Sequence, residues 1–132
     1  MFIRIDKASE EPLYLQIRAQ IIAAMAREVI MPGDSLPSVR SLASELGVNL
    51  HTVNKAYAVL RDEGYLVMRG RSGAVIVDPA DEMSPRQVEE ASQQMEEALH
   101  SLALAHRARG GTAEEFKAAV DKAVAQAYGK DM

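Results

Sequence analysis

The chain has 132 residues, of which 48% are hydrophobic and 26% are charged, a balance typical of a globular protein and not of a disordered chain. Cysteine is absent, which excludes disulfides, thiolate nucleophiles and cysteine-ligated zinc. No apolar run approaches the ~20 residues of a membrane helix, and the first residues are too interrupted for a signal peptide, so we expect a cytoplasmic protein.

The formal net charge of −4 is unevenly distributed. Residues 1–77 carry nine Lys and Arg against eight Asp and Glu, whereas residues 78–132 carry six against eleven. Attraction to a polyanion depends on a local basic patch more than on the global charge. Residues 1–77 are therefore compatible with a nucleic-acid partner, although the net charge of the whole chain is negative.

The N-terminal part begins with an alternation of apolar and polar residues that predicts a short strand over 2–5. A helix follows, and Pro12 suits its first position, where a missing N–H costs nothing. We expect the Pro-Gly-Asp sequence at 32–34 to end this helix. Its apolar stripe comprises Leu13, Ile17, Ile21, Ile22 and Met25.

Two short helices are predicted next. The first begins near Ser38 and ends at Gly47, and the second has Asn49 as its N-cap and Gly64 just past its end. Only about three residues connect them, which is typical of a helix-turn-helix. Their apolar faces consist of Val39, Leu42, Ala43 and Leu46 in the first helix, and of Val53, Ala56, Tyr57 and Leu60 in the second.

A two-stranded ribbon is predicted after these helices, with strands over 65–69 and 74–77 and a glycine at each end of the turn 70–73. A ribbon in this place is typical of a wing. The polar sequence Asp78-Pro79-Ala80-Asp81 then predicts a hinge.

Two more helices are expected beyond the hinge. Ser84 and Gln87 form a capping box that starts a helix ending near Ala108, and Thr112 and Glu115 start the last helix in the same way. The predicted inner stripe of the longer helix is Val88, Met95, Leu99 and Leu102, and the face of the last helix is Phe116, Val120, Ala123, Val124 and Ala127. The expected fold class is mainly α with a small β wing: a winged helix-turn-helix domain in 1–77, a hinge in 78–83 and a two-helix hairpin in 84–132.

Residues 32–66, with Pro12–Ile17 upstream, closely resemble the N-terminal domain of the GntR family of bacterial regulators, and the resemblance spans roughly residues 5–77. The short tail after Val77 resembles that of the YtrA-type subfamily, in which a helical hairpin serves dimerisation. The resemblance implies a transcription regulator, expected to be a repressor, that binds a palindromic DNA operator as a homodimer.

The outward face of the second short helix agrees with this resemblance. Because its apolar residues point inward, His51, Asn54 and Lys55 point outward, with donors and acceptors that reach base edges or phosphates. Similarity to the family adds Arg40, the first residues of the helix and the wing tip. The predicted DNA-binding residues are Arg40, Asn49, Leu50, His51, Thr52, Asn54, Lys55, Arg69, Gly70 and Arg71.

Leu50 departs from the family, in which many members have a basic or hydroxyl residue at this place. A leucine can touch a thymine methyl group but cannot hydrogen-bond a base. The preferred DNA sequence is therefore not predicted.

The tail is predicted to pair with a second copy. A lone hairpin with one apolar stripe per helix cannot bury both stripes, whereas two hairpins can form a four-helix arrangement. The alternative is that the tail packs on its own DNA-binding domain. The predicted dimerisation residues are Val88, Met95, Leu99, Leu102, Phe116, Val120 and Val124.

Other functions receive less support from the residues. His100 and His106, with Glu96 and Glu97 nearby, are a poor metal signature without a third clear ligand, so neither metal nor cofactor is expected. No nucleophile-and-base set or phosphate-binding glycine loop predicts an enzyme. Two alternatives stay open: a small-molecule effector in an interface lined by Met83, Met95 and Phe116, and a winged helix used for protein contacts without DNA.

Overall fold

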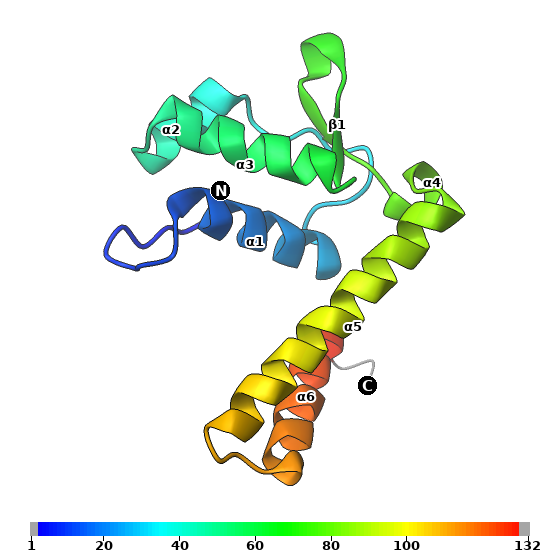
Figure 1. The fold of residues 1–132 in the computed structure, drawn as a ribbon. Helices are drawn as coiled ribbons and strands as arrows, with labels where there is room; N and C mark the ends of the chain where they lie inside the picture. The colour runs from blue at the N-terminus through cyan, green and yellow to red at the C-terminus, as the bar shows by residue number, and fades with distance from the viewer. Residues whose placement is uncertain (1–2, 130–132) are drawn as a thin grey trace. The chain divides into compact units, whose positions relative to one another are not determined.

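The computed structural model describes residues 3–129 of the chain, apart from the side chain of Ser72. Two compact units are present, Met1–Glu82 and Met83–Met132 (Figure 1). The expected fold class is confirmed, since the described residues are mainly helical with one two-stranded antiparallel sheet. The elements are α1 (Leu13–Ala26), α2 (Val39–Leu46), α3 (Leu50–Asp62), β1 (Leu66–Met68), the 3-10 turn η1 (Gly70–Ser72), β2 (Ala74–Ile76), α4 (Pro79–Glu82), α5 (Pro85–Ala108) and α6 (Ala113–Tyr128).

The expected strand over 2–5 is wrong as far as the structure describes it, because Ile3–Ile5 form none. Phe2 lies outside the described residues. The side-chain amides of two α1 residues bind the backbone here instead. Gln20 accepts from the N–H of Arg4 at 2.6 Å and donates to the Arg4 carbonyl. The nitrogen of Gln16 donates to the carbonyls of Asp6 and Glu11, at 3.0 and 2.9 Å, and its oxygen accepts from the N–H of Asp6 at 2.8 Å. Gln16 is buried, and its side chain forms hydrogen bonds with the backbone of the kind that a neighbouring strand would otherwise provide.

Helix α1 also differs from expectation at both ends. Pro12 occupies the N-cap position and the helix begins one residue later. The helix ends at Ala26, well before Pro32, because Glu28 adopts a left-handed φ of 59° and the Val29 N–H bonds back to the Ala24 carbonyl at 2.8 Å. Such a left-handed closure commonly ends a helix, although glycine is its usual residue.

The helix-turn-helix is confirmed. Ser38 caps α2, Gly47 ends it in the left-handed region, and Asn49 caps α3. The core of the first unit lies between α1, α2, α3 and the sheet, and its largest fully buried side chains are Ile17, Ile21, Leu42, Val53, Leu60, Leu66 and Ile76.

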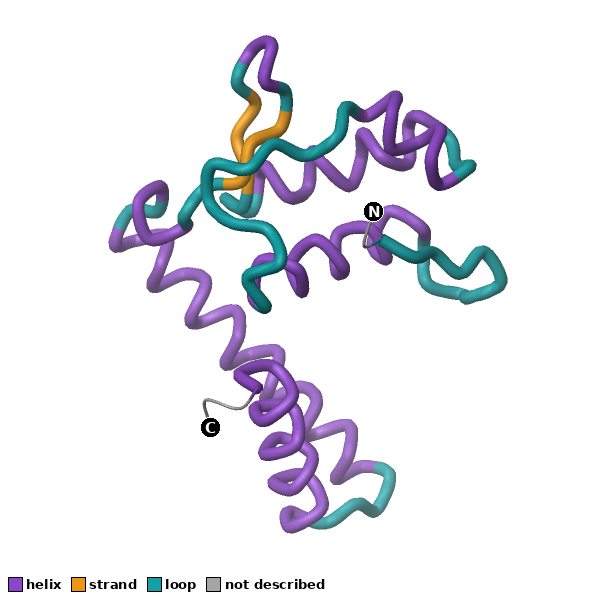
Figure 2. Tube along the Cα trace, turned by 180° about the vertical axis from the view of Figure 1, so that it is seen from behind, coloured by secondary structure: helices purple, strands orange, loops and turns teal. Residues whose placement is uncertain are grey.

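The two strands of the wing pair as expected but are shorter, with Leu66 opposite Ile76 and Met68 opposite Ala74. A third segment, which the sequence did not predict, pairs with the other edge of β2. The N–H of Leu36 donates to the Ala74 carbonyl at 2.8 Å and the N–H of Ile76 donates to the Asp34 carbonyl at 2.8 Å. The loop before α2 thus anchors the wing, and Figure 2 shows this loop running beside the orange strands.

The segment expected to be a hinge contains a helical turn, α4, in the first unit. In the second unit α6 returns alongside α5 (Figure 1), and both predicted capping boxes are present. Neither α5 nor α6 has a buried residue. The half-buried side chains between them are Ala103 and His106 on α5, and Phe116, Val120 and Val124 on α6.

The predicted inner stripe of α5 is therefore not covered by α6. Val88, Met95, Leu99 and Leu102 are 52%, 57%, 42% and 60% exposed. Apolar side chains this exposed on one helix indicate a surface that the hairpin by itself leaves incomplete.

Candidate nucleic-acid interface

The turn between α2 and α3 is held from both sides. The Ser38 hydroxyl accepts from the N–H of Ser41 at 3.0 Å and so satisfies a free donor at the start of α2. At the other end Gly47 has φ 67° and ψ 38°, a conformation that costs any residue with a Cβ roughly 1 kcal/mol or more. The ammonium of Lys7 donates to the Gly47 carbonyl at 2.9 Å. The N-terminal loop thus braces the turn that sets the angle of α3.

A buried tyrosine ties α3 to the segment before α2. The hydroxyl of Tyr57 donates to the Pro37 carbonyl at 2.8 Å, and its side chain is almost fully buried. Burial raises the pKa of the Tyr57 phenol above its ordinary range, so the phenol stays a donor at neutral pH. Because Pro37 precedes Arg40 by three residues, this hydrogen bond helps to fix the position of Arg40 at the start of α2.

The outward face of α3 carries the side chains that the sequence predicts there. His51, Asn54 and Lys55 are exposed, whereas Val53 and Ala56 on the inner face are fully buried. Arg40 is exposed on α2. The helix therefore presents polar donors and acceptors outward from a packed inner face, as direct contact with base edges requires.

The other predicted residues at the start of α3 differ in their environments. Leu50 is 42% exposed and Thr52 is half-buried. The side-chain oxygen of Asn49 accepts from the N–H of His51 at 2.8 Å, so this residue shapes the first turn of α3. The N-terminus of a helix also attracts phosphate through its free N–H groups.

Lys55 has a partner that the sequence did not predict. Its ammonium lies 4.2 Å from the ring centroid of Tyr14 on α1, a cation–π contact. Nearby, the guanidinium of Arg18 forms two hydrogen bonds to the carboxylate of Glu63, at 2.6 and 2.7 Å, which raise the pKa of Arg18. Together these contacts fasten α1 to both the middle and the C-terminal end of α3.

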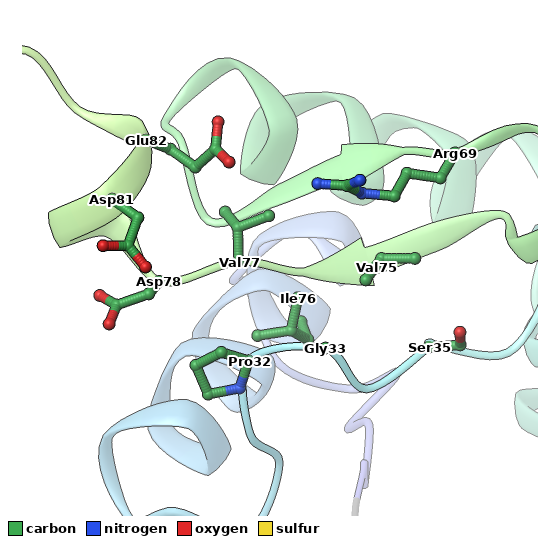
Figure 3. Close-up of a pocket in the computed structure, with 10 residues that line it drawn as sticks. All are labelled: Pro32, Gly33, Ser35, Arg69, Val75, Ile76, Val77, Asp78, Asp81 and Glu82. Atoms are coloured by element: carbon green, nitrogen blue, oxygen red, sulfur yellow. The ribbon is translucent and has the colours of Figure 1, made fainter.

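The two arginines of the wing lie in different surroundings. Arg71 is exposed in the 3-10 turn at the tip, where Gly70 and Gly73 both have a positive φ. Arg69 follows directly after β1, and its side chain lies along one side of a cavity of about 450 Å³. Figure 3 shows its guanidinium extended along the strands, with Asp78, Asp81 and Glu82 gathered at the far end of the same cavity. Of the two, Arg71 is the better placed to touch a phosphate.

The hairpin contains a smaller cavity of about 380 Å³. Of the residues expected to line an effector site, Phe116 borders it, whereas Met83 and Met95 do not. Within residues 3–129 no three His, Cys, Asp or Glu side chains gather in a way that could hold a metal ion. No helix in that range is both long and apolar enough to cross a bilayer.

Comparison with known families matches residues 13–76 to the model described as "Bacterial regulatory proteins, gntR family". The chain is 39% identical over 82 residues to the HTH-type transcriptional regulator Rv1152 of Mycobacterium tuberculosis, a match that covers 61% of this chain and 68% of that protein. It is 44% identical over 70 residues to the HTH-type transcriptional repressor YtrA of Bacillus subtilis, which covers 52% of this chain and 54% of that one. The second match thus spans about half of the relative.

Solved structures resemble the chain over a longer range. The match to the crystal structure of a transcriptional antiterminator from Listeria monocytogenes EGD-e covers all of this chain and 96% of that one, with a TM-score of 0.81 and 27% identity. YtrA from Sulfolobus acidocaldarius, a GntR-family transcription factor, is 42% identical with a TM-score of 0.57, covering 74% and 99% of the two chains. The DNA-binding domain of AraR in complex with operator ORX1 is 26% identical with a TM-score of 0.50, covering 56% and 92%.

Proposed function

This chain belongs to the GntR family of bacterial regulatory proteins, and we propose that it is a YtrA-type repressor that binds a palindromic DNA operator as a homodimer. Its relatives are helix-turn-helix regulators of transcription, and the AraR domain that it resembles was solved in complex with an operator.

One observation carries the DNA-binding role: the outward face of α3. His51 and Asn54 are exposed on a helix whose opposite face is completely packed, and Arg40 is exposed on the preceding helix. An α-helix of this kind fits the major groove, where Asn and Arg distinguish adenine and guanine by paired hydrogen bonds. The wing would add a contact from Arg71 to the backbone of the DNA, which is independent of sequence.

The sparse burial in the second unit supports the dimer, since none of its described residues, 83–129, is buried. A helical hairpin whose side chains are at most half-buried gains little hydrophobic stabilisation of its own, whereas two such hairpins can cover each other's apolar stripes. A two-fold dimer presents two copies of α3 to half-sites related by the same symmetry. We therefore expect an inverted repeat whose half-sites are separated by about one helical turn of DNA, roughly 34 Å.

Repression follows if the operator overlaps a promoter, because the bound dimer then blocks access of the polymerase. A small molecule that binds the tail would release the protein only by favouring a form of the dimer that does not fit the operator. The cavity beside Phe116 is the place in the hairpin where such a ligand would fit.

Selection of bound duplexes from a random pool tests the proposal most directly. We expect the selected sequences to converge on an inverted repeat, and fluorescence anisotropy to show at least a thousandfold tighter binding to it than to a scrambled duplex. Convergence on a single, unrepeated half-site would refute the two-fold arrangement but not DNA recognition. The absence of any convergence at low salt would refute DNA recognition and leave the protein-interaction module.

A further inference from the structure

One face of α5 carries a regular apolar repeat that the described part of α6 does not cover. Every residue of α5 except Ala103 and His106 is exposed. Six of the exposed residues are apolar and alternate at spacings of three and four, which is the a/d repeat of a coiled coil continued over three heptads. They are Val88, Ala91, Met95, Ala98, Leu102 and Ala105, and we call them the α5 seam. Large residues stand at every a position and alanine at every d position.

The α5 seam is distinct from the contact with α6. That contact is made by Ala103 and by His106, whose ring lies 6.1 Å from the ring of Phe116. At 100° of rotation per residue, the centre of the seam lies roughly 90° around the helix from this contact. A helix with two contact faces at about a right angle occupies a corner of a four-helix bundle.

We propose that the α5 of a second copy covers the α5 seam and lies antiparallel to it. In this register Val88 faces the partner's Ala105, Ala91 faces the partner's Leu102, and Met95 faces the partner's Ala98. The inference rests on the dimer of the proposed function and names the surface that forms it.

Side-chain volumes favour this direction over the parallel one. In the antiparallel pair every layer of the seam combines one large side chain with one alanine, so the two helices stay at one separation along the whole seam. A parallel pair would instead alternate layers of two large side chains with layers of two alanines. Such layers leave voids at the alanines or crowd the large side chains, and both are unfavourable.

The charges of α5 allow pairing between two identical copies. The helix carries four glutamates, all within residues 89–97, and Arg86, which precedes them, lies 3.1 Å from the Glu90 carboxylate. The last turn carries Arg107, and Arg109 follows it. The glutamates, Arg86 and Arg107 stand at the b, c and f positions of the repeat, which face away from the seam, so none of them opposes the approach of a second copy. The positions that flank the seam, Gln87, Ser92, Gln94, Leu99, Ser101, His106 and Ala108, have no carboxylate, Lys or Arg that would repel a second copy.

Engineered cysteines give a clean test, because the chain has none of its own. The full-length Ala91→Cys, Leu102→Cys and double variants are oxidised mildly and run on a non-reducing gel. In the antiparallel pair, position 91 lies opposite position 102 of the partner, so the double variant cross-links into dimers. Each single variant leaves its two cysteines about 16 Å apart along the helix axis, beyond the reach of a disulfide, and stays uncross-linked. Leu104→Cys, on the opposite face of α5, is the matched control.

A second pair of variants tests the seam without oxidation. Ala98→Glu places a charge in the middle of the seam at a position already exposed in the single chain, so the helix itself should fold. We expect it to raise the dissociation constant of the dimer at least tenfold in a light-scattering dilution series. Leu104→Glu should leave that constant unchanged.

The outcomes separate this inference from the proposed function. Cross-linking of Ala91→Cys alone would indicate a parallel pair and overturn the inference, while the dimer would stand. A dimer that none of the cysteines cross-links, or that Ala98→Glu leaves intact, would show that another surface joins the copies. A monomeric wild-type chain at micromolar concentration would overturn both the seam and the proposed dimer.

Discussion

Arg40 is the side chain whose loss should most clearly separate DNA recognition from folding. It is exposed, so Arg40→Ala removes a contact to DNA without opening the core. We expect the variant to lose about 1–3 kcal/mol of binding free energy for the selected operator, measured by anisotropy. Arg27→Ala, at the exposed C-terminal end of α1, is the matched control and should bind as the parent does. Equal losses in both variants would contradict the assignment of Arg40.

Tyr57→Phe should lower stability at neutral pH. The substitution removes the hydroxyl that the Pro37 carbonyl accepts from and leaves that carbonyl without this donor. We expect a loss of about 1 kcal/mol in the free energy of unfolding from urea titrations at pH 7.5. An unchanged midpoint would mean that water replaces the hydroxyl at no cost.

The same residue should make stability depend on pH in the alkaline range. Burial raises the pKa of Tyr57 in the folded state, so the unfolded chain releases the phenol proton first. The stabilisation is fully present below the ordinary tyrosine pKa of about 10 and is lost as pH rises above it. We expect the stability gap between the parent and Tyr57→Phe to narrow from pH 8 to pH 10.5 in urea titrations. A gap that stays constant over this range would contradict the burial of the phenol.

For individual residues, the sequence predicts which way a side chain points better than it predicts which groups that side chain contacts. Helical periodicity correctly places His51, Asn54 and Lys55 on the outer face of α3. The same periodicity cannot show that the ammonium of Lys55 lies over Tyr14, because that contact depends on how α1 and α3 pack. Gln16 was missed for a related reason: a glutamine beside an apolar stripe gives no sign that three backbone groups elsewhere need it.

Among the secondary-structure elements, the wing can be tested separately for its contribution to DNA binding. Arg71→Glu reverses a charge at the wing tip, where a contact to a phosphate is independent of sequence. We expect weaker binding to operator and scrambled duplexes alike, and a salt dependence whose slope falls by about one. Gel shifts at several salt concentrations measure both quantities. A loss confined to the operator would assign Arg71 to base recognition instead.

Element boundaries were predictable where a side chain marks them. Ser38, Ser84 and Thr112 cap their helices as expected, because a hydroxyl that accepts from the third N–H of a helix is a local signal. The end of α1 has no such signal, since Glu28 takes a conformation that glycine usually supplies. The pairing of the loop before α2 with β2 joins segments some forty residues apart and is set by the packed fold.

At the scale of the molecule, the two units contribute differently to stability. The first unit contains the whole buried core, whereas the described helices of the second have no buried residue. Most of the hydrophobic stabilisation of a single chain therefore comes from the first unit. The second unit can bury more apolar surface by pairing with a second copy. Stability of the tail should then depend on protein concentration, which links folding of the hairpin to dimer formation.

Removing residues 84–132 tests this division. The remaining segment keeps the complete core of the first unit, so it should fold, with a helical circular dichroism spectrum and a cooperative thermal transition. Without the tail it should be a monomer by light scattering. Its affinity for the inverted repeat should fall by at least a hundredfold, because two half-sites no longer bind as one event. Binding to a single half-site should match that of the parent at the same salt concentration. A truncated chain that stays dimeric, or that keeps its full affinity for the repeat, would show that the first unit pairs by itself and that the tail has another role.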